Sequence, residues 1–501
     1  MLNEQVQTAN GPMQVIKANF TSQLWLPNED WYLEATGNKF WIHWLTIYVP
    51  LPDHKYYDER LVNTAALLVE GGSNKKNETG PPDGTTLGTF LGKRFASFSG
   101  AVSISLEQIP NGRMRFKDWK DGNSGLSGDS LIGYTWRRFL ETGGTEHERL
   151  LLMPMAKAAV LAFNATSDIL QQEQCGRVGS KFPCRKAPLE KYMPWGYSKR
   201  GWTAWLTAAV DYKRVAAVNP IVLSFLNMIP NFHHYWRAYG GWSFAMSPYY
   251  QQNITMTLDD PLNIEAAKIL DPFTFKDRLI MPKLVISAAG DEFFMADDTH
   301  YWLKDMKGPT YFRLLPNAEH ATVLHRRNTK TMYFTMRQFY LSSMLDLRMP
   351  DYCTTRYTRH DGRRGLRIQT NDVLRGLDAF IVDSRDKKRR DYRFIQVREG
   401  SFKPFELETS FPGFEGVFDN EGSDKLSKEI SLKDTLHYHF DKDIAEQDEK
   451  VEYSLTIKAN VWQQYTPHQK INSDYEYDYY VEMEPGELGY RAFMLNAQFQ
   501  V

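Results

Sequence analysis

Three residues of this chain have side chains that together could cleave a carbonyl compound: Ser198, Asp291 and His320. A serine hydroxyl is a poor nucleophile until a histidine takes its proton, and a carboxylate beside the histidine fixes the imidazole tautomer and stabilises the imidazolium. We therefore expect Ser198 to attack an ester or amide, His320 to act as its base and Asp291 to orient that base.

The chain also contains competing residues of the same types. His300 and His325 are the alternative bases, and Asp297 and Asp298 are the alternative acids. Both alternative acids fall inside the helix predicted after Asp291, so they are poorer candidates than a loop residue at the end of a strand. A serine before a helix is often only an N-cap, and a Gly-Asp pair is often only a turn.

The surrounding elements predict how the three residues meet. Residues 192–195, 283–290 and 311–315 are short apolar runs with the length of buried strands, and residues 200–210 have a helical pattern. A serine on a sharp strand-to-helix turn exposes its hydroxyl at the top of a sheet, against the positive end of the helix. The order serine, acid, histidine, each past the carboxyl end of a strand, is that of α/β-hydrolases and differs from the chymotrypsin and subtilisin orders.

The serine turn departs from the usual G-x-S-x-G pattern of such enzymes. Gly196 and Ser198 fit the pattern, but Arg200 stands where the last glycine belongs, and Gly201 follows one place later. The five-residue motif is therefore a weak signal alone. The order of the residues that follow it strengthens the prediction.

Lys199 and Gly72 are the predicted backbone donors to an oxyanion. Such a site commonly combines the N–H of the residue after the nucleophile with an N–H in the loop after the third strand. Residues 64–70 are a predicted buried strand that leads into Gly71-Gly72. Paired glycines let the backbone turn toward a bound oxygen without a Cβ in the way, although an ordinary Gly-Gly turn is the alternative.

Several strings of the chain form a recognisable set: residues 21–25, 43–50, 107–111, 198–203, 282–294 and 316–320. This set resembles the PhoPQ-activated pathogenicity-related proteins, a family that includes autocrine proliferation repressor A-like secreted proteins. The resemblance covers roughly residues 15–345 and extends more weakly to residue 501. The string Ser-Lys-Arg-Gly-Trp is specific, and the family shares its arginine, so Arg200 is no evidence against the fold.

The resemblance implies an α/β-hydrolase-like domain with Ser198, Asp291 and His320 as its triad. It implies no substrate, because members are described mainly by their regulation or biological effect, and a fold does not fix a function. One departure is Tyr197, where many members carry a small residue. A bulky side chain beside the nucleophile is expected to narrow the site.

A length of 501 residues predicts two or three domains. We expect a frayed polar segment at residues 1–14, an α/β-hydrolase-like domain at residues 15–350 with a cap insertion at about residues 223–272, and a β-sandwich-like domain at residues 351–501. The fold class is thus α/β, with a mostly parallel sheet flanked by helices, plus an all-β C-terminal domain. Aromatic residues crowd the cap insertion, where they form its own core or line an apolar substrate pocket.

The C-terminal part alternates β-rich runs with charged stretches. Residues 379–382 and 392–397 are predicted to form a hairpin, with the basic string 387–390 at its tip. A nuclear-import signal or a polyanion-binding patch is the alternative interpretation of that string. Residues 451–461 and 490–501 also alternate, which favours a β-sandwich.

Composition argues against several classes of function. The net charge is -1 and the pI is about 6.9, so no global basic field recruits nucleic acid or an anionic membrane. No apolar run approaches the roughly 20 residues of a membrane span. The pair His233-His234 suggests a metal site, but adjacent residues on a helix point in different directions. We expect neither a metal nor a cofactor.

Cysteines and glycosylation sequons bear on the compartment. Cys175 and Cys184 bracket a loop before the serine turn and could close a small disulfide, which leaves Cys353 unpaired. Residues 1–5 do not resemble a signal peptide. Four N-x-[ST] sequons tilt slightly toward secretion, at Asn19, Asn77, Asn164 and Asn253. We expect an extracellular protein, with a cytoplasmic location as the alternative.

Two functions from different classes fit these observations. The first is a serine hydrolase acting on a small-molecule ester or a peptide through an acyl-enzyme. The second is a secreted signalling or binding protein on a hydrolase scaffold with little or no catalysis, with a cell-surface protein as its partner. Ester and peptide substrates both stay open: no unmistakable carboxylate pair grips a substrate amine, although Glu70, Glu107 and Glu292 could play that part.

Overall fold

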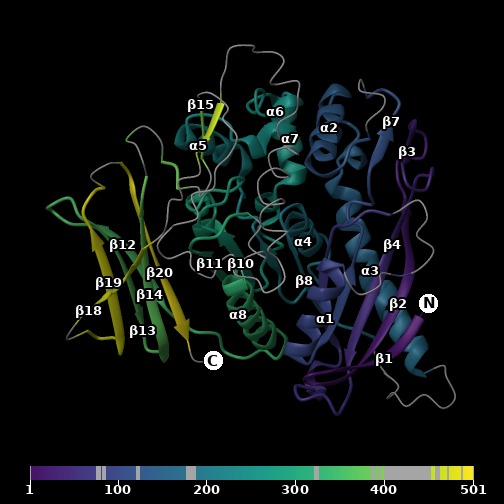
Figure 1. Ribbon diagram of the computed structural model, residues 1–501, viewed down its shortest axis with the longest axis horizontal. Helices are drawn as coiled ribbons and strands as arrows, with labels where there is room; N and C mark the ends of the chain where they lie inside the picture. The colour runs from purple at the N-terminus through teal and green to yellow at the C-terminus, as the bar shows by residue number, and fades with distance from the viewer. Residues whose placement is uncertain are drawn as a thin grey trace.

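The structure is a computed structural model that describes most of the chain. The described residues are 2–74, 81, 86–119, 125–175, 188–320, 326–384, 387, 390–392, 396–399, 453–456, 463–470, 473–486 and 489–499. Figure 1 shows a large helix-flanked sheet and, beside it, a smaller group of C-terminal strands.

Within the described residues, a mixed sheet of nine strands forms the centre of the larger body, in the order β1-β2-β4-β6-β5-β8-β9-β10-β11. A separate short pair joins β3 to β7. The bounds are β1 (Leu2–Thr8), β2 (Gly11–Leu24), β3 (Trp31–Leu33), β4 (Phe40–Pro50), β5 (Thr64–Val69), β6 (Val102–Leu106), β7 (Met114–Phe116), β8 (Lys191–Tyr197), β9 (Asn219–Ile221), β10 (Lys283–Ala288) and β11 (Thr310–Leu315).

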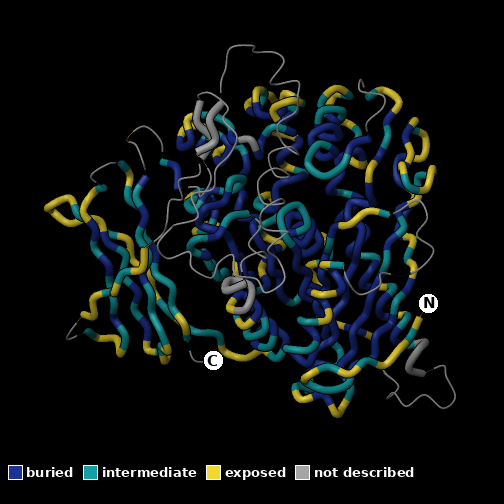
Figure 2. Tube along the Cα trace, in the orientation of Figure 1, coloured by how far each residue is buried: buried dark blue, intermediate teal, exposed yellow. Residues whose placement is uncertain are grey.

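From β6 to β11 in this order the strands run parallel, whereas β1, β2 and β4 are joined antiparallel. Every residue of β5 and β10 is buried, because both faces of the parallel part are covered, and Figure 2 shows this buried centre. The carboxyl ends of β5, β8, β10 and β11 therefore meet at one edge of the sheet, and the candidate site residues follow these ends.

Helices cover both faces of the sheet. Leu67 of β5 packs in the apolar cluster that contains α3 and α4, and Leu68 packs in the cluster that contains α1 and α8. This division follows from the alternation of side chains along a strand. The helices are α1 (Leu87–Ser99), α2 (Gly128–Glu141), α3 (Leu152–Cys175), α4 (Lys199–Val210), α5 (Met228–Tyr239), α6 (Ser247–Gln251), α7 (Pro261–Leu270) and α8 (Arg326–Met344).

The C-terminal strands form two sheets that pack face to face. One sheet has the order β12-β13-β19-β18 and the other β17-β14-β20, and a short pair joins β15 to β16. The bounds are β12 (Cys353–Thr358), β13 (Arg364–Thr370), β14 (Leu374–Asp383), β15 (Gln396–Glu399), β16 (Tyr453–Thr456), β17 (Gln463–Tyr465), β18 (His468–Gln469), β19 (Tyr477–Met483) and β20 (Arg491–Phe499).

The β17-β14-β20 sheet packs against the other C-terminal sheet on one face and against the α/β body on the other. Ala379 of β14 packs against Val481 of the neighbouring C-terminal sheet. Val382 of the same strand points the other way and packs with Met494 against Ala289, directly after β10. The C-terminal strands are thus joined to the larger body next to the end of a strand that leads into the candidate site.

The predicted fold class is confirmed: the chain has an α/β-hydrolase fold followed by separate C-terminal β-sheets that pack as a sandwich. The strands expected before Ser198, Asp291 and His320 are all present, as is the helix after the serine. The segment predicted as a cap contributes α5, α6 and α7, which lie with α2 along the upper side of Figure 1.

Two expectations about strands are wrong. The segment predicted to be frayed, residues 1–14, is ordered from Leu2 on, because β1 pairs along its whole length with β2. The polar side chains of this segment suggested disorder. An edge strand, however, can keep its side chains largely exposed while its backbone is hydrogen-bonded to the next strand. Among the described residues, the hairpin predicted for 379–382 and 392–397 is also not formed: β14 pairs with β17 and β20, and β15 pairs with β16.

Other expectations concern exposure and cysteines. Three of the sequon asparagines are exposed: Asn19, Asn164 and Asn253. Cys353 is exposed and unpaired. The Cys175–Cys184 disulfide and the sequon at Asn77 lie outside the described residues. Of the helices in the described ranges, none combines the length and the apolar character needed to cross a bilayer.

Gly100, which ends α1, allows a test of the packing below the sheet. Its φ is +75°, and a Cβ there would lie 1.6 Å from the Tyr56 carbonyl oxygen. Gly37 has a similar φ of +67° with no atom within 4 Å of a Cβ. We expect Gly37→Ala to cost about 1 kcal/mol of backbone strain. We expect Gly100→Ala to cost several times more, because Tyr56 must move as well.

Thermal melting of the two variants beside the wild type measures this difference. Equal melting temperatures for Gly37→Ala and Gly100→Ala would contradict the close contact between Gly100 and Tyr56.

Candidate active site

Ser198 lies at the turn between β8 and α4. Its φ of 55° and ψ of −127° fall outside the regions that a residue with a Cβ prefers, at a typical cost of about 1–3 kcal/mol. The backbone is held on both sides: the Ser198 N–H donates to the Ile221 carbonyl at 2.9 Å, and the Ser198 carbonyl accepts from the Trp202 N–H at 2.9 Å. The predicted strand-to-helix turn is thus present, with the serine at its tip.

Two glycines let α4 pass close to the sheet at this turn. A Cβ on Gly196 would lie 2.8 Å from the Arg200 carbonyl oxygen and 2.9 Å from that of Val69. A Cβ on Gly201 would lie 3.0 Å from the Gly196 carbonyl oxygen. Gly201 therefore provides the close approach that the usual motif assigns one residue earlier, and the arginine does not destroy the turn.

His320 lies between the other two predicted residues. Its Nε2 is 2.7 Å from Ser198 Oγ, and its Nδ1 is 3.0 Å and 2.9 Å from Oδ1 and Oδ2 of Asp291. A carboxylate only accepts, so Nδ1 carries the proton and Nε2 accepts the hydrogen of the serine hydroxyl. The structure thus brings together the three residues that the sequence analysis singled out, and chemically this arrangement can activate a hydroxyl as a nucleophile.

The turn after β10 holds the Asp291 carboxylate in place. The side chain is fully buried, and its Oδ1 also accepts the backbone N–H groups of Phe293 at 2.7 Å and Phe294 at 3.0 Å. The two phenyl rings lie 4.4 Å and 5.5 Å from the imidazole ring of His320, measured between centroids. One short turn therefore orients the acid and also restricts the imidazole.

Charges around the imidazole shift its protonation. Burial alone would lower the pKa of His320, but the Asp291 carboxylate outweighs burial and the pKa is raised. The neighbouring Glu292 accepts the His320 backbone N–H at 3.2 Å. Burial, followed by the charge of Asp291, raises the pKa of Glu292 to about 7. Glu292 therefore changes charge near neutral pH while in contact with the candidate base.

A largely buried ion pair lies beside the serine turn. Lys199 Nζ is 2.8 Å from Asp129 Oδ2 at the start of α2, and the Tyr249 hydroxyl of α6 donates to the other oxygen at 3.1 Å. Burial opposes the charge of Asp129, but Lys199 outweighs it and lowers the pKa of that carboxyl. Sequence reasoning missed Asp129 and Tyr249, because neither belongs to a motif and only the packing of α2 and α6 brings them here.

The two predicted oxyanion donors lie at the carboxyl ends of neighbouring strands. Lys199 is the first residue of α4, so its N–H has no acceptor within the helix. Gly72 follows β5, which pairs with β8 so that Val69 is opposite Gly196. The φ of Gly72 is +95°, a value that favours glycine. Both residues are thus at the edge of the sheet that carries Ser198.

The three glutamates considered for gripping a substrate amine have internal partners. Glu70 accepts the backbone N–H of Gly71 at 2.6 Å, and Glu107 accepts the Thr86 hydroxyl at 3.1 Å. Glu292 holds the backbone of the candidate base, as described above. These contacts favour positioning roles within the protein over recognition of a substrate.

Tyr197 does not narrow the site as expected. Its ring packs against Trp195 at a centroid distance of 6.1 Å, beside the apolar cluster under α1 and α8. Side chains two residues apart in a strand share a face, so Tyr197 follows Trp195 into that core rather than toward the carboxyl edge.

The competing acids and bases lie elsewhere. His300 is exposed and contacts Tyr301 edge-on. Asp297 is 3.0 Å from His234 Nε2. The carboxylate oxygens of Asp298 are buried without a hydrogen-bond partner among the described residues. His325 lies outside the described residues.

The cap segment contacts the acid turn through its own hydrogen bonds. The hydroxyls of Tyr235 and Ser243 both donate to the Glu292 carbonyl at 2.8 Å, and the Tyr239 hydroxyl donates to the Asp291 carbonyl at 3.2 Å. Aromatic rings of this segment pack against one another, as expected for a cap with its own core. No sequence motif pointed to these three donors.

In the part of the chain that the structure describes, no group of three His, Cys, Asp or Glu side chains has an arrangement that could hold a metal ion. His233 contacts Asp259 and His234 contacts Asp297, so the adjacent histidines have separate partners.

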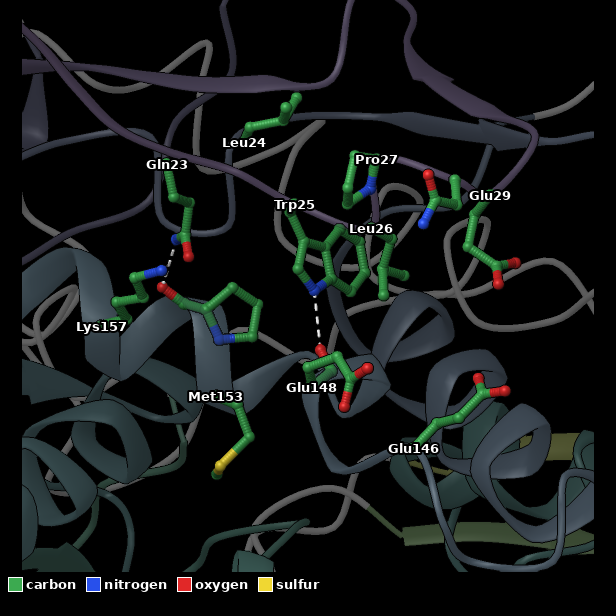
Figure 3. A pocket seen from close by; sticks show the side chains of 12 residues that line it. Gln23, Leu24, Trp25, Leu26, Pro27, Glu29, Glu146, Glu148, Met153 and Lys157 are labelled. Atoms are coloured by element: carbon green, nitrogen blue, oxygen red, sulfur yellow. Dashed lines mark hydrogen bonds between the residues drawn. The ribbon is translucent and has the colours of Figure 1, made fainter.

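A pocket of about 400 Å³ lies apart from Ser198, between the end of β2 and the start of α3 (Figure 3). Two of its polar groups bond within the protein: the Gln23 amide donates to the Pro154 carbonyl at 2.7 Å, and the Trp25 indole donates to the Glu148 carbonyl at 2.8 Å. Its lining residues are Gln23, Leu24, Trp25, Leu26, Pro27, Asn28, Glu29, Glu146, Glu148, Met153, Pro154 and Lys157.

Comparison with known sequences gives two matches. The sequence model of a family described as "PhoPQ-activated pathogenicity-related protein" matches residues 1–393. Autocrine proliferation repressor protein A of Dictyostelium discoideum is 36% identical over 444 residues, which cover 81% of this chain and 83% of that protein.

Solved structures resemble the chain more distantly. Est1E from Butyrivibrio proteoclasticus is 11% identical with a TM-score of 0.34, and the match covers 60% of this chain and 96% of that one. Acetyl xylan esterase 1 from Thermoanaerobacterium sp. is 13% identical with a TM-score of 0.39, covering 68% and 87%. A Pyrococcus horikoshii acylaminoacyl peptidase is 10% identical with a TM-score of 0.39, covering 66% and 42%. Scores this low carry no function across.

Glu292 gives the protein a pH-dependent stability. Its pKa of about 7 in the folded chain is above its ordinary value of 4.5, so the folded state holds this proton more tightly than the unfolded state. The stability it contributes is complete below about pH 4.5 and is lost as pH rises through about 7. We expect Glu292→Gln, which keeps an acceptor for the His320 N–H, to melt increasingly above the wild type as pH rises.

Melting temperatures of both proteins at pH 5.5, 7 and 8.5 measure this trend. A difference that stays constant from the lowest to the highest pH would show that Glu292 does not titrate in this range.

Proposed function

The chain belongs to the PhoPQ-activated pathogenicity-related protein family, and we propose that it is a serine hydrolase cleaving an ester or amide bond, with Ser198, Asp291 and His320 as its catalytic triad. The observation that carries this proposal is the short contact from His320 Nε2 to Ser198 Oγ, 2.7 Å, with Asp291 on the opposite ring nitrogen. A serine in a strained turn, a histidine acceptor and a buried carboxylate in this order are the arrangement that activates a serine hydroxyl, and they support the proposal.

The proposed reaction begins with attack by Ser198 Oγ on the substrate carbonyl carbon. The hydroxyl proton moves to His320 Nε2, and Asp291 stabilises the imidazolium that results. The carbonyl oxygen becomes an oxyanion, to which the N–H groups of Lys199 and Gly72 donate. His320 then gives its proton to the departing alcohol or amine, and the acyl group stays on Ser198.

The second half of the reaction frees the enzyme. A water molecule enters, His320 takes one of its protons, and the hydroxide attacks the acyl carbon. Collapse of the second oxyanion breaks the bond to Ser198, whose oxygen regains a proton from His320. The acid product leaves and the starting state returns.

The pair of Lys199 and Asp129 lies within electrostatic reach of His320. The two side chains bond to each other and are largely shielded from water, so they do not choose between an ester and an amide. We propose a small-molecule ester or a peptide as the substrate.

The second candidate function is signalling, with little or no catalysis. It is favoured by the relative named autocrine proliferation repressor protein A. On this proposal the chain is secreted and acts on a cell-surface protein, and the exposed sequon asparagines are compatible with that route. Ser198→Ala distinguishes the two functions, because it abolishes hydrolysis and leaves a scaffold-borne effect on proliferation unchanged.

A fluorophosphonate probe tests the hydrolase proposal without a known substrate, because it reacts with an activated serine. We expect one adduct, located on Ser198 by intact mass and peptide mapping. We expect Ser198→Ala to give none, and His320→Ala to react several orders of magnitude more slowly, because triad members act as a unit.

Two control variants change a histidine and an aspartate outside the triad. His300→Ala and Asp297→Asn change residues of the same types that contact other groups, so both should label at nearly the wild-type rate. Folded wild-type protein that forms no adduct, or His320→Ala that labels like the wild type, would refute the proposed triad.

A further inference from the structure

Arg200 is the residue that sets this serine turn apart from the usual motif, and its side chain crosses to another part of the site. It leaves α4 two residues after Ser198, and its Nε donates to the Ile109 carbonyl at 2.6 Å. Ile109 belongs to the loop after β6. The arginine thus ties the start of the nucleophile helix to the loop after β6, a strand separated from β8 by β5.

The guanidinium fills the space beside Gly71. A Cβ on Gly71 would lie 2.6 Å from Arg200 Nη2 and 2.9 Å from Cζ. A residue with a Cβ at position 71 would collide with the guanidinium as long as Arg200 keeps its position. The usual motif has a glycine at position 200; here an arginine stands at 200 and the glycine that makes room for it is Gly71, in the facing loop. Arg200 and Gly71 are therefore the two sides of one contact.

The loop after β5 is further joined to the loop after β6 through the backbone. The Gln108 N–H donates to the Gly71 carbonyl at 2.7 Å, and the Ile109 N–H donates to the Glu70 carbonyl at 3.0 Å. The Glu70 carboxylate accepts the Gly71 N–H at 2.6 Å and attracts the arginine electrostatically. Arg200 thus packs against a pair of loops that hold each other.

We infer that Arg200 is a positioning residue that sets the distance between the two oxyanion donors of the proposed hydrolase. One donor, Lys199, precedes the arginine in α4, and the other, Gly72, follows the glycine against which its guanidinium lies. Donors stabilise an oxyanion only if they are held in place before the charge forms. This inference rests on the proposed function and adds to it the reason why an arginine replaces the glycine.

Energetics favour this role over a simple gain in stability. Arg200 and Glu70 are only partly exposed, so both lose hydration that their mutual attraction returns only in part, and such pairs are a weak source of stability. Arginine also differs from lysine in holding a planar fork of donors in a fixed direction. Lysine at this position would keep the charge and lose both the Nε donor and the planar surface against Gly71.

The test compares Arg200→Lys with Arg214→Lys, a change at an arginine beyond the other end of α4. Both are assayed with p-nitrophenyl acetate and with the fluorophosphonate probe. We expect Arg200→Lys to lower kcat by about 10²-fold, the loss typical of one misplaced oxyanion donor. KM should be nearly unchanged, and the pH at which activity falls on the acidic side should be the same as in the wild type. Arg214→Lys should match the wild type.

Two outcomes would overturn the inference. A wild-type kcat in Arg200→Lys would show that the arginine does not set the donors. A rise in KM alone would show that Arg200 binds substrate directly. If Arg200→Lys fails to fold, Gly71→Ala, which displaces the guanidinium from the other side, must reproduce the fall in kcat, with Gly37→Ala as its control.

A readout without catalysis separates this inference from the proposed function. In Arg200→Lys, amide hydrogen exchange should become faster in peptides covering residues 65–74 and 107–113, while peptides from α1 and α8 keep their wild-type rates. If the wild type neither hydrolyses nor labels, the hydrolase proposal fails, and the exchange data still decide whether Arg200 holds the loops. Unchanged exchange in both loops would refute that role.

Discussion

The close approach of α4 to the parallel sheet is the constraint on which the rest of the site depends. The turn at Ser198 can form only because Gly196 and Gly201 leave room for the helix against the strands. The turn fixes the positions of the Ser198 hydroxyl and of the Lys199 backbone N–H, and it fixes the point from which the Lys199 side chain extends. The other candidate groups, Gly72, Asp291 and His320, lie just after the ends of β5, β10 and β11.

Largely buried ionisable groups around this turn are arranged in separate pairs. His320 faces Asp291, Lys199 faces Asp129, and the arginine beside them lies near a glutamate. Burial opposes charge in each case, and a partner of opposite sign restores it in part. The arrangement keeps several charges within a small volume without leaving any of these six groups alone, and it lets the proposed nucleophile work in surroundings poor in water.

Local sequence patterns were sufficient to predict the parallel sheet and the residues at its carboxyl edge, because a buried parallel strand is a continuous apolar run and the order of Ser198, Asp291 and His320 is characteristic. They failed where long-range pairing decides. The polar β1 is a strand only because β2 offers it a backbone partner, and β14 pairs with β20, more than a hundred residues away, rather than with the nearest β-rich run. Asp129 and Tyr249 could not be predicted as site residues, because only the packing of α2 and α6 over the serine turn places them there.

The two-sided burial of the β17-β14-β20 sheet has a consequence for how this protein can evolve. Val382 and Met494 are covered by the α/β body, and Ala379 is covered by the other C-terminal sheet. Neither body can be exchanged for an unrelated module without baring an apolar surface that invites self-association. The two bodies are therefore expected to be inherited together, as a single unit of descent, wherever this sheet is kept.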